Sequence, residues 1–395
     1  MLAIALTFFF TCYLALAYGL GLYLFPVLLP DMQASLGFDY TTIGLMSGAA
    51  QAGYMVAALL SGALTPRIGG TRLVFLSIFA CAVTLACLSQ VTGPWLLGAG
   101  LTMLGAAAAS IWVPMVDVVA RFIPERNRAT VFGVFSSGGG YGALVNGMVV
   151  PGLLLSVGWR SVWLVLGLAT LALALIGGII LYRFGIFARH ASTTAAAKTP
   201  ALRGAATLLR SRLVLLLWTL MFFICIAYLP FQTYLAAYLR TELSFSVQQT
   251  GALWTVFGLA AAVGGAALGL LADRIGIRRA MAVTLALLLV AALVLACYPQ
   301  GWLPFAAAAA YGISYGAIYG LTPAYVARML PLQVSSPVFG FGNVLIGLGG
   351  VAGNVLGGYS KSMTGSLHYV YLGVAAATVL LLIITWRLDD DRLRG

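Results

Sequence analysis

The stretch GLLADRIGIRR, residues 269–279, recurs in the same chain at a fixed offset. Its counterpart GALTPRIGGTR lies 207 residues earlier, at residues 62–72, and shares six identical residues with it. At the same offset, five residues within 120–133 (Ala120, Arg121, Pro124, Phe132 and Gly133) and two within 140–142 (Gly140 and Gly142) are also identical. One register across three separated stretches predicts two halves that share one architecture. In a membrane chain, two related halves around a central site are typical of transporters.

The composition is that of a membrane protein. Hydrophobic residues make up 62% of the 395 residues, charged residues make up only 8%, and mean hydropathy is +1.04. A soluble domain carries about 25% charged residues, and a helix that spans a bilayer needs about 20 apolar residues. Twelve apolar runs are long enough to be expected spans: 3–29, 41–64, 73–91, 95–119, 131–156, 161–182, 213–238, 247–271, 279–298, 303–326, 337–360 and 368–386.

The net charge of +12 follows the expected topology. If the N-terminus is cytoplasmic, all but three of the 21 basic residues lie in cytoplasmic segments, and the exceptions are Arg160, Arg240 and Lys361. The positive-inside rule therefore predicts that both termini are cytoplasmic. The basic excess marks orientation in a lipid bilayer, so a nucleic-acid partner is not expected.

The one long break in hydrophobicity divides the chain into two expected bundles. Residues 183–212 are basic at both ends and rich in Ser, Thr and Ala between them, which is typical of a cytoplasmic linker. We therefore expect an N-terminal six-helix bundle at 1–182 and a C-terminal six-helix bundle with a short cytoplasmic tail at 213–395. The expected fold class is an all-α membrane protein with twelve transmembrane helices in two pseudo-symmetric bundles.

The quoted stretch resembles the signature loop of the major facilitator superfamily, Gly-x-x-x-Asp-Arg-x-Gly-x-Arg-Arg. Together with the repeat, the twelve expected spans and the linker, the resemblance covers essentially the whole chain. Asp273 can accept hydrogen bonds from the N-terminus of a neighbouring helix, whose dipole favours an anion, or it can pair with Arg328. Such contacts would form a latch that holds the two halves together in one conformational state and releases them in another. Arg274 follows Asp273 directly in this loop.

The first copy of this loop lacks the acidic residue, because Pro66 stands where the second copy has Asp273. Asp117 can compensate, since it lies one helical turn before Arg121. A carboxylate inside a span is costly and is often functional. Three roles stay open for Asp117: gating or structural pairing with Arg121, proton coupling, and contact with the substrate.

A second set of residues resembles the monocarboxylate and oxalate/formate branch of the superfamily. It runs from Pro114 through a glycine-rich stretch at 138–142 to the Gly-Trp-Arg of 158–160. The resemblance implies a Lys or Arg deep in the eighth or eleventh span, and this chain has neither. A simple dicarboxylate is therefore not expected, because burying it without a cation is costly.

The expected binding groups are aromatic and neutral polar side chains. Tyr311, Tyr315 and Tyr319 are spaced i, i+4, i+8 along the tenth span, so an α-helix presents them on one face. In the superfamily that the chain resembles, the first, fourth, seventh and tenth helices line the central cavity. Hydroxyl and amide groups hold a polar substrate group while rings hold its apolar part, although the same aromatic residues also pack between helices. The candidate substrate-binding residues are Tyr18, Trp112, Asn146, Tyr228, Gln232, Tyr311, Tyr315, Tyr319 and Asn343.

The expected function is secondary transport of a small organic solute across the cytoplasmic (inner) membrane by alternating access. A monocarboxylate carried with a coupling proton is the first expectation, with no enzyme activity, no cofactor and no metal. A monomer is expected, as is usual in the superfamily. Two alternatives stay open, a proton-driven exporter of drugs or metabolites and a solute-sensing receptor on a transporter scaffold.

Overall fold

The computed structural model describes residues 2–124, 131, 134–135, 137–186, 211–330 and 332–389, and within these residues the regular structure is helical. The helices of the first half are α1 (Leu2–Leu14), η1 (Ala15–Tyr23), α2 (Leu24–Leu36), α3 (Tyr40–Ile68), α4 (Gly70–Leu88), α5 (Pro94–Trp112), α6 (Met115–Phe122) and α8 (Gly138–Arg183). The helices of the second half are α10 (Arg212–Thr233), α11 (Leu235–Thr241), α12 (Val247–Ile275), α13 (Ile277–Cys297), α14 (Leu303–Met329), α15 (Leu332–Thr364) and α16 (His368–Arg387).

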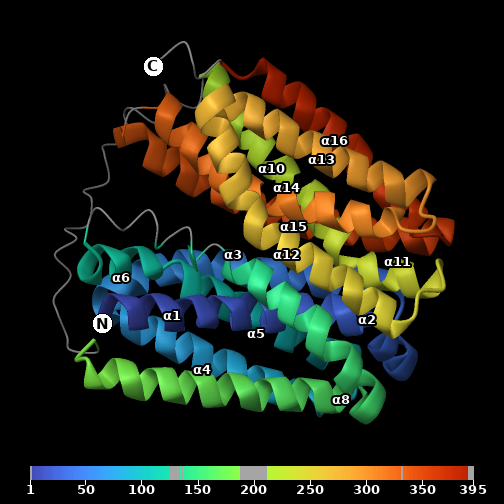
Figure 1. Cartoon of the computed structure of the whole chain (residues 1–395), viewed down its shortest axis with the longest axis horizontal. Helices are drawn as coiled ribbons and strands as arrows, with labels where there is room; N and C mark the ends of the chain where they lie inside the picture. Colours follow the sequence, from blue (N-terminus) through green and yellow to red (C-terminus); the bar gives the residue numbers. More distant parts are fainter. Residues whose placement is uncertain are drawn as a thin grey trace.

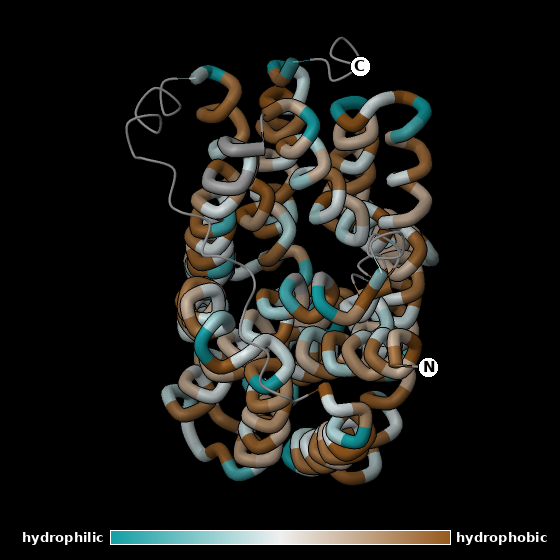
Figure 2. The backbone as a smooth tube through the Cα atoms, turned by 90° about the vertical axis from the view of Figure 1, so that its left-hand side faces the viewer, coloured by the Kyte–Doolittle hydropathy of each residue, from teal (hydrophilic) through white to brown (hydrophobic). Residues whose placement is uncertain are grey.

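The helices form two bundles, the N-terminal bundle of α1–α8 and the C-terminal bundle of α10–α16, which lie one above the other in Figure 1. We call the end that carries Leu2, Arg183, Arg212 and Arg387 the linker end, and the end that carries the α2–α3 and α15–α16 turns the opposite end. Viewed from the linker end, hydrophilic residues gather at the ends of the helices while the helix bodies are largely hydrophobic (Figure 2).

The described helices are compatible with twelve spans. Ten of them are long and apolar enough to cross a membrane, when α1 to α2, α5 to the first part of α6, and α10 to α11 are each counted as one. The 46-residue α8 turns back at Gly158, where φ is 75° and ψ is 166°, so it contributes two passes. The 27-residue α14 is not among these ten helices but lies within the C-terminal bundle. The chain is a multi-pass membrane protein.

The two copies of the repeated loop have the same local structure. Gly69 ends α3 with φ 92° and Gly276 ends α12 with φ 90°, and each is followed directly by the next helix. A φ near 90° is unfavourable for a residue with a Cβ, so glycine is required at this turn in both halves. The repeat read from the sequence is therefore a repeat of backbone geometry.

The bundles touch near the opposite end and separate toward the linker end (Figure 1). On α3, a Cβ added at Gly44 would be 2.7 Å from the Asn354 carbonyl oxygen of α15, and one added at Gly48 would be 3.4 Å from Val351. Farther along the same face of α3, Leu59 is 59% exposed and a Cβ added at Gly62 would meet nothing within 4 Å.

A second pair of helices, α8 and α12, shows the same change along its length. A Cβ added at Gly147 would meet Gly251 and Thr255, whereas one added at Gly269 would meet nothing within 4 Å. Described residues of the two bundles therefore pack closely from the opposite end to about the middle of the molecule, where a Cβ added at Gly140 would be 2.6 Å from the Ala262 amide nitrogen, and the conformation is open at the linker end.

Most of the expected linker lies outside the described residues, as do the basic residues at 189, 198, 203 and 210 and the acidic tail beyond residue 389. The division into 1–182, 183–212 and 213–395 stays a prediction.

Candidate functional site

A pair of phenols at the centre joins the two bundles. The hydroxyls of Tyr23 on η1 and Tyr315 on α14 are 2.7 Å apart and share a hydrogen bond. Within the N-terminal bundle, Tyr18 and Tyr54 share a similar bond of 2.9 Å. Tyr18, Tyr54 and Tyr315 are half-buried although they lie midway along their helices, while Tyr23 is only 4% exposed.

The predicted tyrosine stripe on α14 exists as one face, but its burial is graded. Tyr311 is fully buried, stacks on Phe231 at 4.1 Å between ring centroids, and donates to the carbonyl of Tyr228 at 2.9 Å. Tyr315 is half-buried and Tyr319 is 37% exposed, so exposure increases toward the linker end. Tyr311 is therefore a packing residue at the buried end of the stripe, whereas Tyr315 and Tyr319 are accessible.

Four further predicted binding residues are buried or half-buried. Tyr228 and Gln232 are buried beside Tyr311, and Trp112 is half-buried. Asn146 is fully buried and its Nδ2 donates to the Gly19 carbonyl at 2.6 Å, so it joins α8 to η1.

Asn343 is the one predicted binding residue that lies on the linker-end half of α15. It is exposed, and its Nδ2 donates to the Phe339 carbonyl of its own helix at 2.9 Å. In this conformation its amide is therefore turned to its own backbone.

The charged residues predicted for gating lie near the linker end. Arg121 Nε donates to Asp117 Oδ1 at 2.9 Å, so the i,i+4 pair forms. The other carboxylate oxygen, Oδ2, lies against Gly70 at the N-terminus of α4, where the helix dipole favours a negative charge. The pair therefore lies against the start of α4, although Oδ2 itself has no hydrogen-bond partner among the described residues.

Among the described residues, the acidic residue of the second loop has no comparable ion pair in this conformation. Asp273 is exposed and makes no ion pair with a described side chain, and Arg274 and Arg328 are exposed as well. The linker-open geometry is the one in which a latch between the linker ends of the bundles would be released.

At the opposite end, polar contacts close the seam between the bundles. Arg240 on α11 pairs with both carboxylate oxygens of Asp31 on α2, with Nη2 to Oδ1 at 3.0 Å. The hydroxyls of Thr41 and Ser362 share a bond of 2.8 Å. These contacts exist only while the opposite ends of the bundles stay together.

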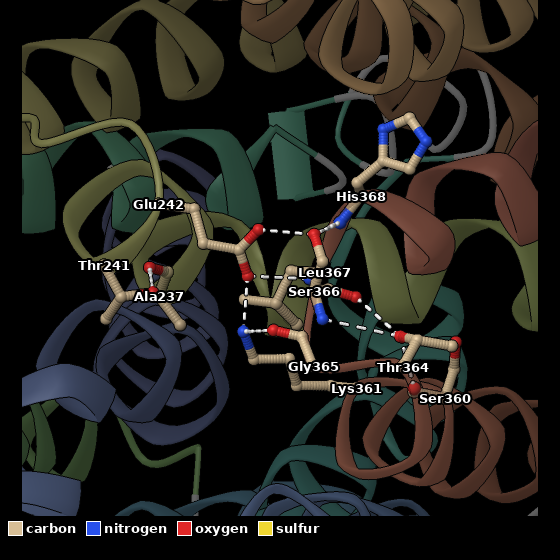
Figure 3. Close-up of polar contacts among 10 residues, drawn as sticks. All are labelled: Ala237, Thr241, Glu242, Ser360, Lys361, Thr364, Gly365, Ser366, Leu367 and His368. Atoms are coloured by element: carbon tan, nitrogen blue, oxygen red, sulfur yellow. Dashed lines mark hydrogen bonds and ion pairs between the residues drawn. The ribbon is translucent and has the colours of Figure 1, made fainter.

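A carboxylate cluster supports this seam from within the C-terminal bundle (Figure 3). Glu242 accepts from Lys361 Nζ at 2.6 Å, from Ser366 Oγ at 2.7 Å and from the Leu367 amide at 2.7 Å. Burial raises the pKa of Glu242, but these hydrogen bonds together outweigh burial and hold its pKa below the ordinary value. The Lys361 ammonium also lies 5.2 Å from the ring centroid of Tyr40 on α3 of the other bundle.

Sequence reasoning missed Tyr23 and Tyr54. Tyr23 follows Tyr18 by five residues, which places it on another face of an ideal α-helix, and η1 is a π-helix instead. Tyr54 lies in the second expected span, 41–64, whereas the helices expected to line the cavity were the first, fourth, seventh and tenth. The sequence did contain one indication of the polar contacts at the opposite end. Arg240 and Lys361, two of the three basic residues expected outside the cytoplasm, both form ion pairs there.

The centre offers hydroxyl groups that both donate and accept hydrogen bonds, surrounded by aromatic rings. Trp254 and Phe257 on α12 pack within 6.4 Å of the Tyr23 ring. This arrangement can hold a small solute with an apolar or aromatic body and one hydrogen-bonding group.

A family model described as "Major Facilitator Superfamily" matches residues 11–353 and 231–395. A solved structure of nucleoside transporter NupG, in mutant form, is similar with a TM-score of 0.75 and 15% identity, over 96% of this chain and 99% of that one. At that identity the likeness concerns the fold alone.

Three curated relatives match with low identity. A gallate transporter of Pseudomonas putida is 24% identical over 41% of this chain and 36% of its own length. A probable galactarate/D-glucarate transporter of Bacillus subtilis is 28% identical over 37% of this chain and 33% of its own length. The match with these two therefore spans about a third of their length. A cis,cis-muconate transport protein of Acinetobacter baylyi is 22% identical over 94% of this chain and 91% of its own length.

Proposed function

The chain belongs to the Major Facilitator Superfamily and is a transporter of a small solute rather than an enzyme, and from that premise we propose that it carries an organic acid with a single carboxyl group, together with a proton. It works by alternating access: the two bundles rock about the central tyrosines, so that the site opens at one end and then at the other.

The observation that carries this proposal is the set of phenols between the bundles. Tyr18, Tyr54, Tyr315 and Tyr319 are accessible in a conformation that is open at the linker end. Hydroxyl donors surrounded by rings suit one carboxyl group on an apolar or aromatic body. The relatives named for gallate, galactarate or D-glucarate, and cis,cis-muconate support an organic acid as the substrate class.

Proton coupling follows from the cost of moving a carboxylate through this centre. The charged residues of the sequence lie toward the ends of the spans, and an unpaired carboxylate between them would be strongly disfavoured. A carboxyl group that moves with a proton carries no net charge. Asp117 is held by Arg121, which supports the pairing role for Asp117 over the proton-coupling role.

The orientation and location belong to the same proposal. Because most of its basic residues lie at the linker end, we place the linker end and both termini in the cytoplasm and the protein in the inner membrane. The conformation described here is then open to the cytoplasm. We propose that the working unit is a monomer with one site between its bundles.

The test is substrate-driven proton movement in liposomes that contain the purified protein. Monocarboxylates, dicarboxylates, amino acids and cationic dyes are offered in turn, and external pH and labelled-solute flux are recorded together. External alkalinisation on adding a monocarboxylate supports proton symport. Carboxylate flux without proton movement contradicts coupling, and a response confined to cationic dyes replaces the proposal with export.

A further inference from the structure

The first membrane span contains a nine-residue π-helix, η1, between α1 and α2. In an α-helix each residue turns by about 100°, so Tyr18 and Tyr23 would lie roughly 140° apart around the axis. In a π-helix a residue and the fifth after it are hydrogen-bonded neighbours on one face. Their rings are accordingly in contact, with centroids 6.4 Å apart. The π-helix is what brings both phenols to the centre.

Contacts with α8 hold this segment in place. Asn146 Nδ2 donates to the carbonyl of Gly19, and Gly19 and Gly142 pack backbone against backbone so closely that a Cβ on either would collide with the other. The amide of Asn146 thus holds a π-helical carbonyl at the level of the tyrosines.

Tyr23 reaches across the seam between the bundles. Its ring packs against Trp254, Phe257 and Tyr315 of the C-terminal bundle at 6.3 to 6.4 Å between centroids, and its hydroxyl bonds to Tyr315. When the bundles part at the opposite end, Tyr23 must leave these rings and the hydrogen bond must break. Tyr315 is half-buried on the accessible side, so a solute entering from the linker end reaches this bond.

We propose that the Tyr23–Tyr315 bond is a closure that the substrate replaces. This inference rests on the proposed function. A protonated carboxyl group accepts a hydrogen bond at its carbonyl oxygen and donates one from its hydroxyl, so it fits between two phenols as each separates from the other. Binding of the acid offsets the loss of the bond, and the opposite end then opens.

The first experiment needs no substrate. Spin labels are attached to cysteines introduced at Thr92 and Gln300, exposed turn residues at the opposite end of the two bundles, with the exposed Cys87 and Cys297 replaced by serine. The distance between the labels is measured by pulsed electron paramagnetic resonance. Tyr23→Phe and Tyr315→Phe each remove the bond, and each should raise the ratio of long to short distances about fivefold, the effect of one net hydrogen bond.

The matched control is Tyr13→Phe. Tyr13 is a buried phenol on α1 of the same span, and it donates to the Ala174 carbonyl within its own bundle at 3.3 Å. The control should leave the distances unchanged. If Tyr23→Phe does not fold, Tyr315→Phe tests the same bond from the other bundle. Distances that match the parent protein in every folded variant would overturn the proposal.

The second experiment adds 4-hydroxybenzoate as the probe. The parent protein should shift toward the long distance, and the double variant with both phenylalanines should shift less because the bond is already absent. A parent that carries the probe into liposomes while its label distance stays unchanged contradicts the replacement step. Failure of every acid to cross the liposome would instead contradict the proposed function, and the substrate-free distances would still decide the role of the bond.

Discussion

Replacing Gly44 by alanine should shift the protein away from the linker-open state. The added Cβ would lie 2.7 Å from the Asn354 carbonyl oxygen and 3.2 Å from the Tyr234 hydroxyl, both on the other bundle. A contact under 3 Å with a backbone atom requires the helices to move apart, and overpacking of this kind costs about 1–3 kcal/mol. Since about 1.4 kcal/mol is a tenfold change, the ratio of opposite-end-open to linker-open protein should rise roughly 5- to 150-fold.

The control for this substitution lies on the same face of the same helix. Gly62 follows Gly44 by 18 residues, about five full turns, and a Cβ there meets nothing within 4 Å. Gly62→Ala therefore has no steric cost in the linker-open state. The two variants differ only in whether the added methyl group meets the other bundle.

The assay is alkylation of a cysteine placed at Val351, which packs against Gly48 at the seam. The exposed Cys87 and Cys297 are again replaced by serine. A membrane-impermeant maleimide is added on the opposite-end side, and the initial rate reports the fraction of open protein. Gly44→Ala should raise this rate and Gly62→Ala should not. Equal rates in Gly44→Ala and the parent protein, or an equal increase in Gly62→Ala, would refute the steric argument.

Three further outcomes are expected. Asp273→Asn should lower the initial rate of transport while leaving membrane insertion and folded yield unchanged, because the latch acts in the state that is closed at the linker end; wild-type transport would contradict that role. Asp117→Asn should slow transport but keep substrate-driven proton uptake, since the carboxylate pairs with Arg121 at 2.9 Å, and loss of proton uptake alone would give Asp117 the coupling role. The pKa of Glu242 lies below its ordinary 4.5, so its contribution to stability is complete above that pH and is lost as the pH falls through the lowered value. The thermal midpoint should therefore fall on acidification below about pH 4.5, and in Glu242→Gln this acid-dependent part of the fall should be absent.

Several local features of the structure could be predicted from residue type and spacing. The repeat predicted that the two halves share one architecture, and its matching glycines, Gly69 and Gly276, both adopt a φ near 90° that only glycine accepts easily. The i,i+4 spacing of Asp117 and Arg121 predicted a contact that a helix creates by itself. The α14 tyrosines share a face for the same reason. In each case the cause lies within one helix or one turn, so neighbouring residues contain the information.

The hydrogen bond between Tyr23 and Tyr315 could not be predicted from residue type and spacing, because it depends on a departure from α-helical geometry. The spacing of Tyr18 and Tyr23 places them on different faces of an α-helix, and the π-helix that unites them is packed against Asn146 and Gly142 of another helix. Tyr315, the partner of Tyr23, lies 292 residues away along the chain.

The sequence by itself determined that the chain crosses a membrane many times, that its halves repeat one architecture and where its charges gather. These properties follow from hydropathy and from local backbone preference, which act over one helix or turn. Only the tertiary structure decided which end is open and which phenols meet between the bundles. Those depend on how two bundles of similar helices lie against each other, and the contacts that fix this, such as Asp31 with Arg240, join residues that only folding brings together.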